Sequence, residues 1–442
     1  MKRIYTILCG IVLAAMLLVG LISTFDKDAT FSEDENRKLK TRPKLTFSGL
    51  LDGSYNSDYW DYYADTFPGR ESLMDKNVAL NGFYYFGGLA SGDDATLVLD
   101  FTSNAAQHGE ALKDPDATQP TGETQSPEET IPEQTEPAGV AEQLGNIVLI
   151  GDSAFDVPNA DGDLIVRYAQ AVTGLANLLG SDVQTLSMPV PNSAEFYTKN
   201  EYHSGSHSQQ AMVEKVKENL GASVTYVDAY TELAKHTGEY IYFRTDHHWT
   251  HLGAYYAYVA LCRTLGMTPV TTDQFATGQW DNFVGSLYTY AANYPSAQVL
   301  KENPDTVYYW KPNANCTTMC YKSTDLTGGY AMGTICKVNE DVDNKYLTFM
   351  GGDHPVAIVE TDTDGPCILV IKESYGNAVI SWLTNHYSKI ILIDPREYFG
   401  SNSDIDLAAF TQAQGVDQLL VINYPMMLSS ENYISLLEKL AQ

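Results

Sequence analysis

Basic residues are scarce in this sequence. Lys and Arg together number 27 among 442 residues, against 56 Asp and Glu, so the formal net charge is −29. Proteins that bind the phosphates of nucleic acids or the headgroups of anionic lipids use clustered Lys and Arg. We therefore expect neither a nucleic-acid partner nor electrostatic docking on an anionic membrane surface.

Cysteine is also infrequent, with six in the chain. Three of them, Cys316, Cys320 and Cys336, fall in a stretch rich in Thr, Asn and Gly, where we expect one disulfide. Cys262 and Cys367 lie within apolar patterns and are expected to be buried thiols. Because no fourth ligand stands near Cys316 and Cys320, no zinc site is predicted. We expect neither a metal ion nor a cofactor.

Charge is absent from a long apolar run near the amino terminus. Residues 4–25 contain no Asp, Glu, Lys or Arg. As a helix they would measure ~33 Å, enough to cross a bilayer. We predict an uncleaved signal-anchor transmembrane helix over residues 1–25, with Lys2 and Arg3 inside the cell and the following chain outside. The alternative is a cleaved signal peptide, which would leave a secreted protein.

Composition divides the rest of the chain into three parts. Residues 26–101 form a turn-rich, aromatic juxtamembrane region. Residues 102–142 have few large apolar residues, and their Pro, Thr, Gln and Glu cannot bury enough surface to fold. We therefore expect a disordered acidic insertion there. Apolar patterns return at about residue 143, and residues 143–442 are expected to form an α/β domain.

Strand-like and helix-like segments alternate in that last part. Helices are expected over residues 164–179 and 208–220. Short apolar strands are expected at 147–150, 183–188, 223–227, 367–371, 389–393 and 418–422. Apolar strands that alternate with helices are typical of a parallel sheet covered on both faces, whose site lies beyond the carboxyl ends of the strands. The candidate site residues should therefore lie in the loops that follow these strands.

A polar cluster at residues 242–251 (YFRTDHHWTH) precedes a helical pattern that ends at Gly266. In an extended chain, Asp246 and His248 point to the same side, so the carboxylate could orient the imidazole as in a catalytic triad. Two other interpretations stay open. Asp246 could cap the helix while the histidines form local hydrogen bonds, or Asp246, His247 and His251 could together hold a cation.

A triad also needs a nucleophile, and two serines follow apolar strands. Ser374 leads directly into a helical pattern, where backbone N–H groups and the helix dipole would stabilise an oxyanion. Ser153 is soon followed by Pro158 and a turn, which makes a poorer platform for a nucleophile. We therefore favour Ser374.

Several motifs together resemble those of one protein family. Residues 245–250 (TDHHWT) resemble the signature of the DHHW family, which is similar to the SGNH-hydrolase-like domains of the alginate O-acetyltransferases. Other elements of that family are resembled by residues 32–37 (SEDENR), 65–70 (DTFPGR), 351–355 (GGDHP) and 372–377 (KESYGN). The resemblance covers most of residues 30–400 apart from the acidic insertion. It implies an SGNH-hydrolase-like α/β fold: a doubly wound, mostly parallel sheet with helices on both faces.

The resemblance also implies site residues. The alginate enzymes use an Asp-x-His pair and a later Ser, which correspond here to Asp246, His248 and Ser374. Ser153 aligns with a family segment that has no catalytic serine. The sequence departs from the family at two positions: Glu373, where Asp is frequent, and Asp353, where Asn is frequent. These differences bear on which groups would donate hydrogen bonds to the oxyanion, more than on the triad.

The function implied by the resemblance is acetyl transfer outside the cytoplasm. Ser374 would carry the acetyl group to a hydroxyl of a cell-surface polysaccharide or peptidoglycan, and a membrane-bound O-acyltransferase would supply it. Backbone N–H groups at Ser374, Tyr375 and Gly352 would receive the oxyanion, while His247 and Trp249 would support the motif. The alternatives are a cell-surface carbohydrate acetylesterase and a non-catalytic envelope or glycan-binding protein of the same fold.

Overall fold

The computed structural model describes residues 137–338, 342–402 and 404–442, together with short pieces between residues 31 and 63. The chain divides into two units, Met1–Leu97 and Val98–Gln442. In the first, β1 (Phe31–Ser32) pairs antiparallel with β2 (Arg37–Lys38). The expected anchor, and the expected insertion up to residue 136, lie outside the described residues. Within the described part of the chain, no helix has the length and apolar character needed to span a membrane.

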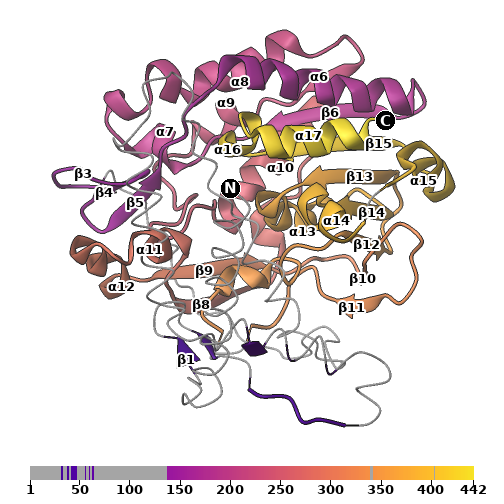
Figure 1. Ribbon diagram of the computed structural model, residues 1–442. Coiled ribbons are helices and arrows are strands. Elements are labelled where there is room, and N and C mark those ends of the chain that lie inside the picture. The colour runs from indigo at the N-terminus through magenta and orange to yellow at the C-terminus, as the bar shows by residue number, and fades with distance from the viewer. Residues whose placement is uncertain are drawn as a thin grey trace, which may run out of the picture. The chain divides into compact units, whose positions relative to one another are not determined.

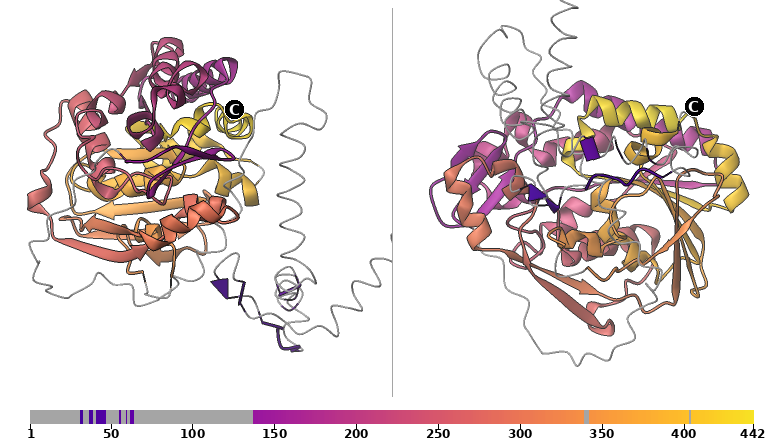
Figure 2. Two further views of the ribbon diagram at one scale, coloured as in Figure 1. Left: turned by 90° about the vertical axis from the view of Figure 1, so that its left-hand side faces the viewer. Right: turned by 60° about the horizontal axis from the view of Figure 1, so that its bottom comes forward.

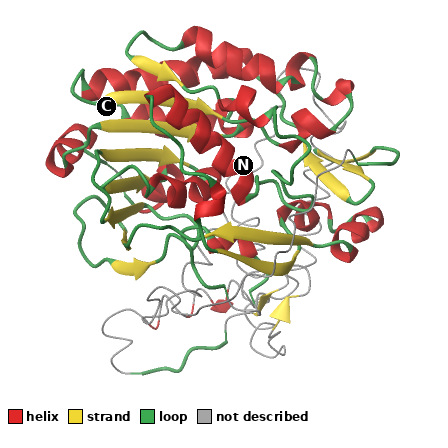
Figure 3. Ribbon diagram, turned by 180° about the vertical axis from the view of Figure 1, so that it is seen from behind, coloured by secondary structure: helices red, strands yellow, loops and turns green. Residues whose placement is uncertain are grey.

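The second unit is built on an eight-stranded mixed sheet with the order β11-β10-β12-β14-β13-β15-β6-β7 (Figures 1 and 3). Strands β14, β13, β15, β6 and β7 run parallel, whereas β12, β10 and β11 are joined antiparallel. The bounds of the parallel strands are Gln184–Pro189 (β6), Val224–Tyr226 (β7), Cys367–Lys372 (β13), Lys389–Ile393 (β14) and Gln418–Asn423 (β15). The antiparallel strands are Cys316–Tyr321 (β10), Tyr330–Met332 (β11) and Val356–Thr361 (β12).

The expected doubly wound, mostly parallel sheet is thus met only in part. The apolar runs predicted strands at the places where β6, β7, β13, β14 and β15 form, and β13 is buried along its whole length. Strand β10, by contrast, carries Thr and Cys and is only partly buried. A strand that is partly exposed does not need helices on both faces, which permits antiparallel pairing at that side of the sheet.

The strand predicted at 147–150 forms, but not in this sheet. It is β4 (Ile147–Ile150), which pairs antiparallel with β3 (Glu142–Leu144) and β5 (Ser153–Asp156) in a separate three-stranded sheet. The turn between β4 and β5 contains Gly151 with φ +61, a left-handed conformation that glycine adopts without strain. Such a short hairpin forces β5 back beside β4. Parallel neighbours would need a longer crossover.

Helices pack on the main sheet in two groups (Figures 1 and 2). The first includes α6 (Gly162–Leu179), α8 (Gln209–Asn219) and α17 (Glu431–Leu440), with α14 (Pro395–Ser401), α15 (Leu407–Gln414) and α16 (Pro425–Leu428). The second includes α9 (Ala229–Leu233), α10 (His251–Leu265) and α13 (Ile380–Leu383). The helices predicted at 164–179 and 208–220 are confirmed, as is the end of α10 at the left-handed Gly266.

Smaller elements complete the unit. Helix α7 (Ser193–Tyr197) follows β6, and β8 (Thr277–Phe283) pairs antiparallel with β9 (Asp305–Trp310). Helices α11 (Ser286–Ala291) and α12 (Gln298–Glu302) contribute Leu287, Ala291 and Leu300 to a second small core against β3, β4 and β5.

The expected disulfide is wrong for this structure. Cys316, Cys320 and Cys336 are all free thiols. Cys316 and Cys320 lie four residues apart on the single strand β10, which separates them by ~13 Å. The thiols of Cys316 and Cys336 instead donate to nearby backbone carbonyls. Cys262 and Cys367 are buried thiols, as expected.

Candidate active site

Three segments meet where the parallel strands end. The first is the loop that carries Asp246, His247 and His248 and leads into α10, whose first turn is capped by the Thr250 side chain. The second follows β13: Ser374 begins a short 3₁₀ helix (Ser374–Val379) that continues into α13. The third is the loop that precedes β12 and contains Gly352 and Asp353. The site therefore lies beyond the carboxyl ends of parallel strands, where ligands bind in α/β folds.

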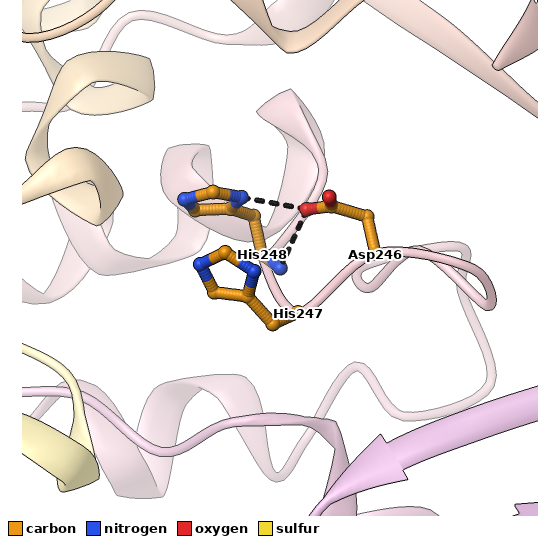
Figure 4. Close-up of side chains that lie close together, drawn as sticks. All are labelled: Asp246, His247 and His248. Carbon is orange, nitrogen blue, oxygen red and sulfur yellow. Dashed lines mark hydrogen bonds and ion pairs between the residues drawn. The ribbon is translucent and has the colours of Figure 1, made fainter. Parts of the chain in front are cut away.

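Asp246, His248 and Ser374 are joined in one hydrogen-bonded chain. The His248 Nε2 atom lies 2.8 Å from Ser374 Oγ, although the two residues are 126 positions apart. On the other side of the ring, Nδ1 lies 2.6 Å from Asp246 Oδ1 (Figure 4). A nucleophile, a base and an orienting carboxylate are arranged in this way in a catalytic triad.

A tight turn, rather than extended chain, sets the pairing of Asp246 with His248. Asp246 Oδ1 accepts the backbone N–H of His248 at 3.0 Å as well as contacting its ring (Figure 4). The second oxygen, Oδ2, accepts the backbone N–H of Ser286 at 2.8 Å. Gly285 allows this approach, because a Cβ atom there would lie 2.2 Å from Asp246 Cβ. Both carboxylate oxygens are thus fixed by the fold.

The electrostatics of the cluster favour an ionised Asp246. Burial alone would raise the pKa of this carboxyl, but the neighbouring His248 and His247 and its hydrogen bonds hold the pKa below the usual range. Burial, together with the charge of His248, lowers the pKa of His247 to about 3. His247 is therefore a neutral imidazole near pH 7, while Asp246 remains able to stabilise a protonated His248.

Tyr346 was not identified from the sequence. Its ring stacks on that of His248 with centroids 3.8 Å apart and planes 12° apart, and its hydroxyl donates to the Ser374 carbonyl oxygen at 3.2 Å. Tyr346 therefore holds both His248 and the nucleophile loop. It lies in a short 3₁₀ helix (Lys345–Thr348), and no motif in the sequence marks it.

Trp249 and His247 tie the two main loops together. The indole of Trp249 is fully buried and donates to the Tyr375 carbonyl oxygen at 3.0 Å. The Tyr375 hydroxyl in turn donates to the His247 carbonyl oxygen. The ring of His247 contacts Ser286 Oγ through Nδ1 at 2.5 Å. These contacts connect the residue after Ser374 to the residues on either side of His248.

Two of the three expected oxyanion donors, the N–H groups of Tyr375 and Gly352, already have acceptors. The Tyr375 N–H donates to Glu373 Oε2 at 2.9 Å, because the Glu373 side chain caps the 3₁₀ helix that Ser374 begins. The Gly352 N–H donates to the Phe349 carbonyl oxygen at 3.2 Å. Glu373 is fully buried, which raises its pKa.

A buried charge cluster of Lys372, Asp353, Asp394 and Arg396 lies next to the loop that carries Ser374. Lys372 Nζ lies 2.6 Å from Asp353 and 3.5 Å from Asp394, and Arg396 bonds both carboxylates at 2.8 and 2.7 Å. Asn377, three residues after Ser374, donates to Asp353 at 2.8 Å. Two positive and two negative charges therefore balance. Lys372 ends the apolar strand β13 and Asp394 directly follows β14, so charged residues at the carboxyl ends of these strands were the sequence signal for this cluster.

Ser153 is placed differently from Ser374. It lies on β5 in the small antiparallel sheet, and its hydroxyl contacts the Asp152 carboxylate at 3.3 Å. Among the described residues, no histidine is its hydrogen-bond partner.

His251 does not join the cluster, so the cation site built from Asp246, His247 and His251 is not formed. Its ring accepts from the Trp310 N–H and contacts Ser381 Oγ. Asp246, His247 and His248 do have ligand atoms within 4.8 Å of one another and could together hold a metal ion.

Comparisons with known proteins place this site in a family. The family model of the DHHW protein matches residues 114–393. A DHHW family protein from Eubacterium siraeum has 27% sequence identity and a TM-score of 0.60, over 68% of this chain and 98% of that chain. Bacillus cereus PatB1, in a structure with a sulfonyl adduct, has 17% identity and a TM-score of 0.52, over 65% and 98%.

The O-acetyltransferase domain of Pseudomonas putida AlgJ matches with 15% identity and a TM-score of 0.37, over 68% of this chain and 98% of that chain. Comparison with curated proteins finds no match. Since the family model matches more than half of the chain, the protein belongs to the DHHW family.

Proposed function

We propose that this protein is an extracytoplasmic O-acetyltransferase that uses Ser374, His248 and Asp246 as a catalytic triad. One observation carries the proposal: His248 contacts Ser374 Oγ at 2.8 Å through Nε2 and Asp246 at 2.6 Å through Nδ1. These two contacts give a nucleophile, a general base and an orienting carboxylate, the three groups that acyl transfer through a serine requires.

The proposed reaction has two steps. First, Ser374 Oγ attacks the carbonyl carbon of an acetyl ester while His248 Nε2 takes the serine proton and then gives it to the departing alcohol oxygen. Second, an acceptor hydroxyl attacks the acetyl-serine, His248 takes the proton of that hydroxyl, and Ser374 leaves and regains a proton. Asp246 holds the imidazole in the required tautomer and stabilises its positive charge throughout.

Donor, acceptor and location complete the proposal. The acceptor would be a hydroxyl of a cell-surface polysaccharide or peptidoglycan. The donor would be an acetyl group delivered by a membrane-bound O-acyltransferase. The uncharged run at residues 4–25 supports export, with the protein either anchored by that run or secreted after its cleavage.

The nucleophile is tested with a sulfonyl fluoride, because a protein of similar fold carries a sulfonyl adduct. We expect the probe to label Ser374, and Ser374→Ala to lose both labelling and acetyl-ester turnover. Ser153→Ala is the matched control, since Ser153 also follows an apolar strand but has no histidine as a hydrogen-bond partner among the described residues. Loss of turnover in Ser153→Ala alone would overturn the assignment, and loss in neither variant would make the protein non-catalytic.

Transfer is separated from hydrolysis by adding a glycan acceptor. A transferase should form acetylated glycan at the expense of free acetate. Acetate release that no glycan changes would identify an esterase with the same triad.

A further inference from the structure

One buried carboxylate outside the triad holds the segment that leads into Asp246. Asp305, the first residue of β9, is 1% exposed and lies 60 positions after Thr245. Its Oδ2 atom accepts the Thr245 backbone N–H at 2.8 Å and the Thr245 hydroxyl at 2.6 Å. Its Oδ1 atom accepts the Tyr240 hydroxyl, and the Arg244 backbone N–H lies 3.2 and 3.1 Å from the two oxygens. Both oxygens of Asp305 therefore hold the residues directly before Asp246.

The Arg244 guanidinium offsets the charge of Asp305. Its Nε atom donates to Asp305 Oδ1 at 3.4 Å, and its Nη1 atom pairs with Asp152 at 2.5 Å. Its Nη2 atom donates to the carbonyl oxygens of Asn303 and Pro304 at 3.3 and 3.1 Å. A buried carboxylate is tolerated where it has a partner of opposite charge and its oxygens accept hydrogen bonds. Asp305 meets both conditions, so its two oxygens keep fixed directions.

Thr245 connects Asp305 to both sides of Asp246. It directly precedes Asp246, and its Oγ1 atom, which donates to Asp305, also accepts the Gly285 N–H at 3.0 Å. The next N–H of that turn, from Ser286, donates to Asp246 Oδ2 at 2.8 Å. Asp305 therefore fixes the residue before Asp246 and, through the Thr245 hydroxyl, the turn that binds the second Asp246 oxygen.

The position of Asp246 sets the position of the His248 ring (Figure 4). Asp246 Oδ1 lies 2.6 Å from His248 Nδ1 and accepts the His248 backbone N–H at 3.0 Å. On the other side of the ring, Nε2 lies 2.8 Å from Ser374 Oγ. A displacement of about 1 Å in a catalytic site can cost about 10²-fold in rate. A residue that fixes Asp246 can therefore act on the reaction without touching the substrate.

We propose that Asp305 is a positioning residue for acyl transfer: through Thr245 it holds Asp246, and with it the His248 ring, in the geometry that attack by Ser374 needs. This inference rests on the proposed function of the triad. The alternative is that Asp305 stabilises the fold and leaves the rate of each folded molecule unchanged, so the two are separated by measuring the rate per active site.

The test compares Asp305→Asn and Thr245→Val with the parent, each as the purified full-length protein. In Asp305→Asn an amide NH₂ would face donors that a carboxylate oxygen now accepts. Thr245→Val keeps the charges and the shape and removes the hydroxyl between Asp305 and Gly285. The substrate is p-nitrophenyl acetate. The readouts are kcat, the rate and final extent of sulfonyl fluoride labelling of Ser374, and the thermal unfolding midpoint. Dividing kcat by the labelled fraction gives the rate per active site.

Glu232→Gln is the matched control. Glu232 is also a buried carboxylate, 4% exposed, that pairs with an arginine. That partner, Arg263, lies ~18 Å along α10 from His251, at the end of the helix away from the site. We expect kcat per labelled site to fall about 10²-fold in Asp305→Asn. In Thr245→Val it should fall about fivefold, the effect of one lost hydrogen bond. The labelling rate should fall with it, whereas Glu232→Gln should keep the parent values per site and lower only the unfolding midpoint.

The outcomes separate the two proposals. If Asp305→Asn and Thr245→Val keep the parent kcat per labelled site, the positioning role is refuted while the triad stands. A loss in Asp305→Asn without any loss in Thr245→Val refutes the route through Thr245, and an equal loss in Glu232→Gln refutes a role specific to Asp305. If Ser374 is not labelled in the parent and Ser374→Ala retains turnover, the proposed function itself fails. Should Asp305→Asn not fold, Thr245→Val decides alone.

Discussion

Replacing Asp353 by Asn removes the central carboxylate of the buried charge cluster behind Ser374. Its two oxygens accept hydrogen bonds from Lys372 at 2.6 Å, Asn377 at 2.8 Å and Arg396 at 2.8 Å, and its side chain is 5% exposed. Without this carboxylate, Asp394 alone would face two buried cations. Removing one partner of a buried ion pair costs about 3–5 kcal/mol, because the charge left behind has no compensation.

The measurement is the thermal unfolding midpoint of the purified full-length protein. At about 2 °C per kcal/mol, the midpoint of Asp353→Asn should fall by about 6–10 °C. Glu438→Gln is the control, because Glu438 pairs with Arg167 at 2.9 Å through side chains that are 39% and 37% exposed. An exposed pair contributes at most about 1 kcal/mol, so this control should shift by about 2 °C or less. Equal shifts in the two variants would refute the reasoning.

The pH dependence of stability in the parent protein and in Asp353→Asn checks whether the loss of stability is electrostatic. Burial alone would raise the pKa of Asp353, but the charges of Lys372 and Arg396 hold that pKa well below the usual range. A carboxyl with a lowered pKa stabilises the folded state above its unfolded pKa of about 3.9 and loses this effect as the pH falls further. The difference between parent and Asp353→Asn should therefore shrink below about pH 4. A difference that grows in acid would contradict this.

Three further predictions concern the site. Gly285→Ala forces its new Cβ against Asp246, and acetyl-ester turnover should fall about 10²-fold through the misplaced carboxylate. Trp249→Phe removes the hydrogen bond to the Tyr375 carbonyl oxygen. It should lower the free energy of unfolding by about 1 kcal/mol and turnover by less than Gly285→Ala does. Treatment with EDTA should leave turnover unchanged, because both ring nitrogens of His248 already have partners. Activity that is lost and then restored by one divalent ion would instead identify a metal site.

Local sequence patterns were a sound guide to single elements and a weaker guide to their assembly. The apolar runs predicted β13, β14 and β15 because burial on both faces requires continuous Val, Ile and Leu. The run at 147–150 had the same character, yet it pairs in the small sheet, since the short turn at Gly151 leaves no room for a crossover. Apolar content alone does not tell which sheet a strand joins.

The site divides in the same way. Asp246 and His248 are close in the chain, and their spacing was enough to predict that they meet. The chain there is not extended as predicted: it forms a turn in which the Asp246 side chain accepts the His248 backbone N–H. Tyr346 could not be assigned from the sequence, because its contacts with His248 and Ser374 depend on where a distant short helix comes to lie.

By itself, the sequence determined the local properties of this protein: its acidity, its apolar strands, the pairing of Asp246 with His248, and a serine at the start of a helix. The tertiary structure alone decided the mixed sheet, the balanced charges around Asp353, and the stacking of Tyr346 on His248. The physical reason is the separation along the chain of the residues that interact. Local features follow from neighbouring residues, whereas ion pairs, stacking and burial depend on residues that meet only when distant segments pack together.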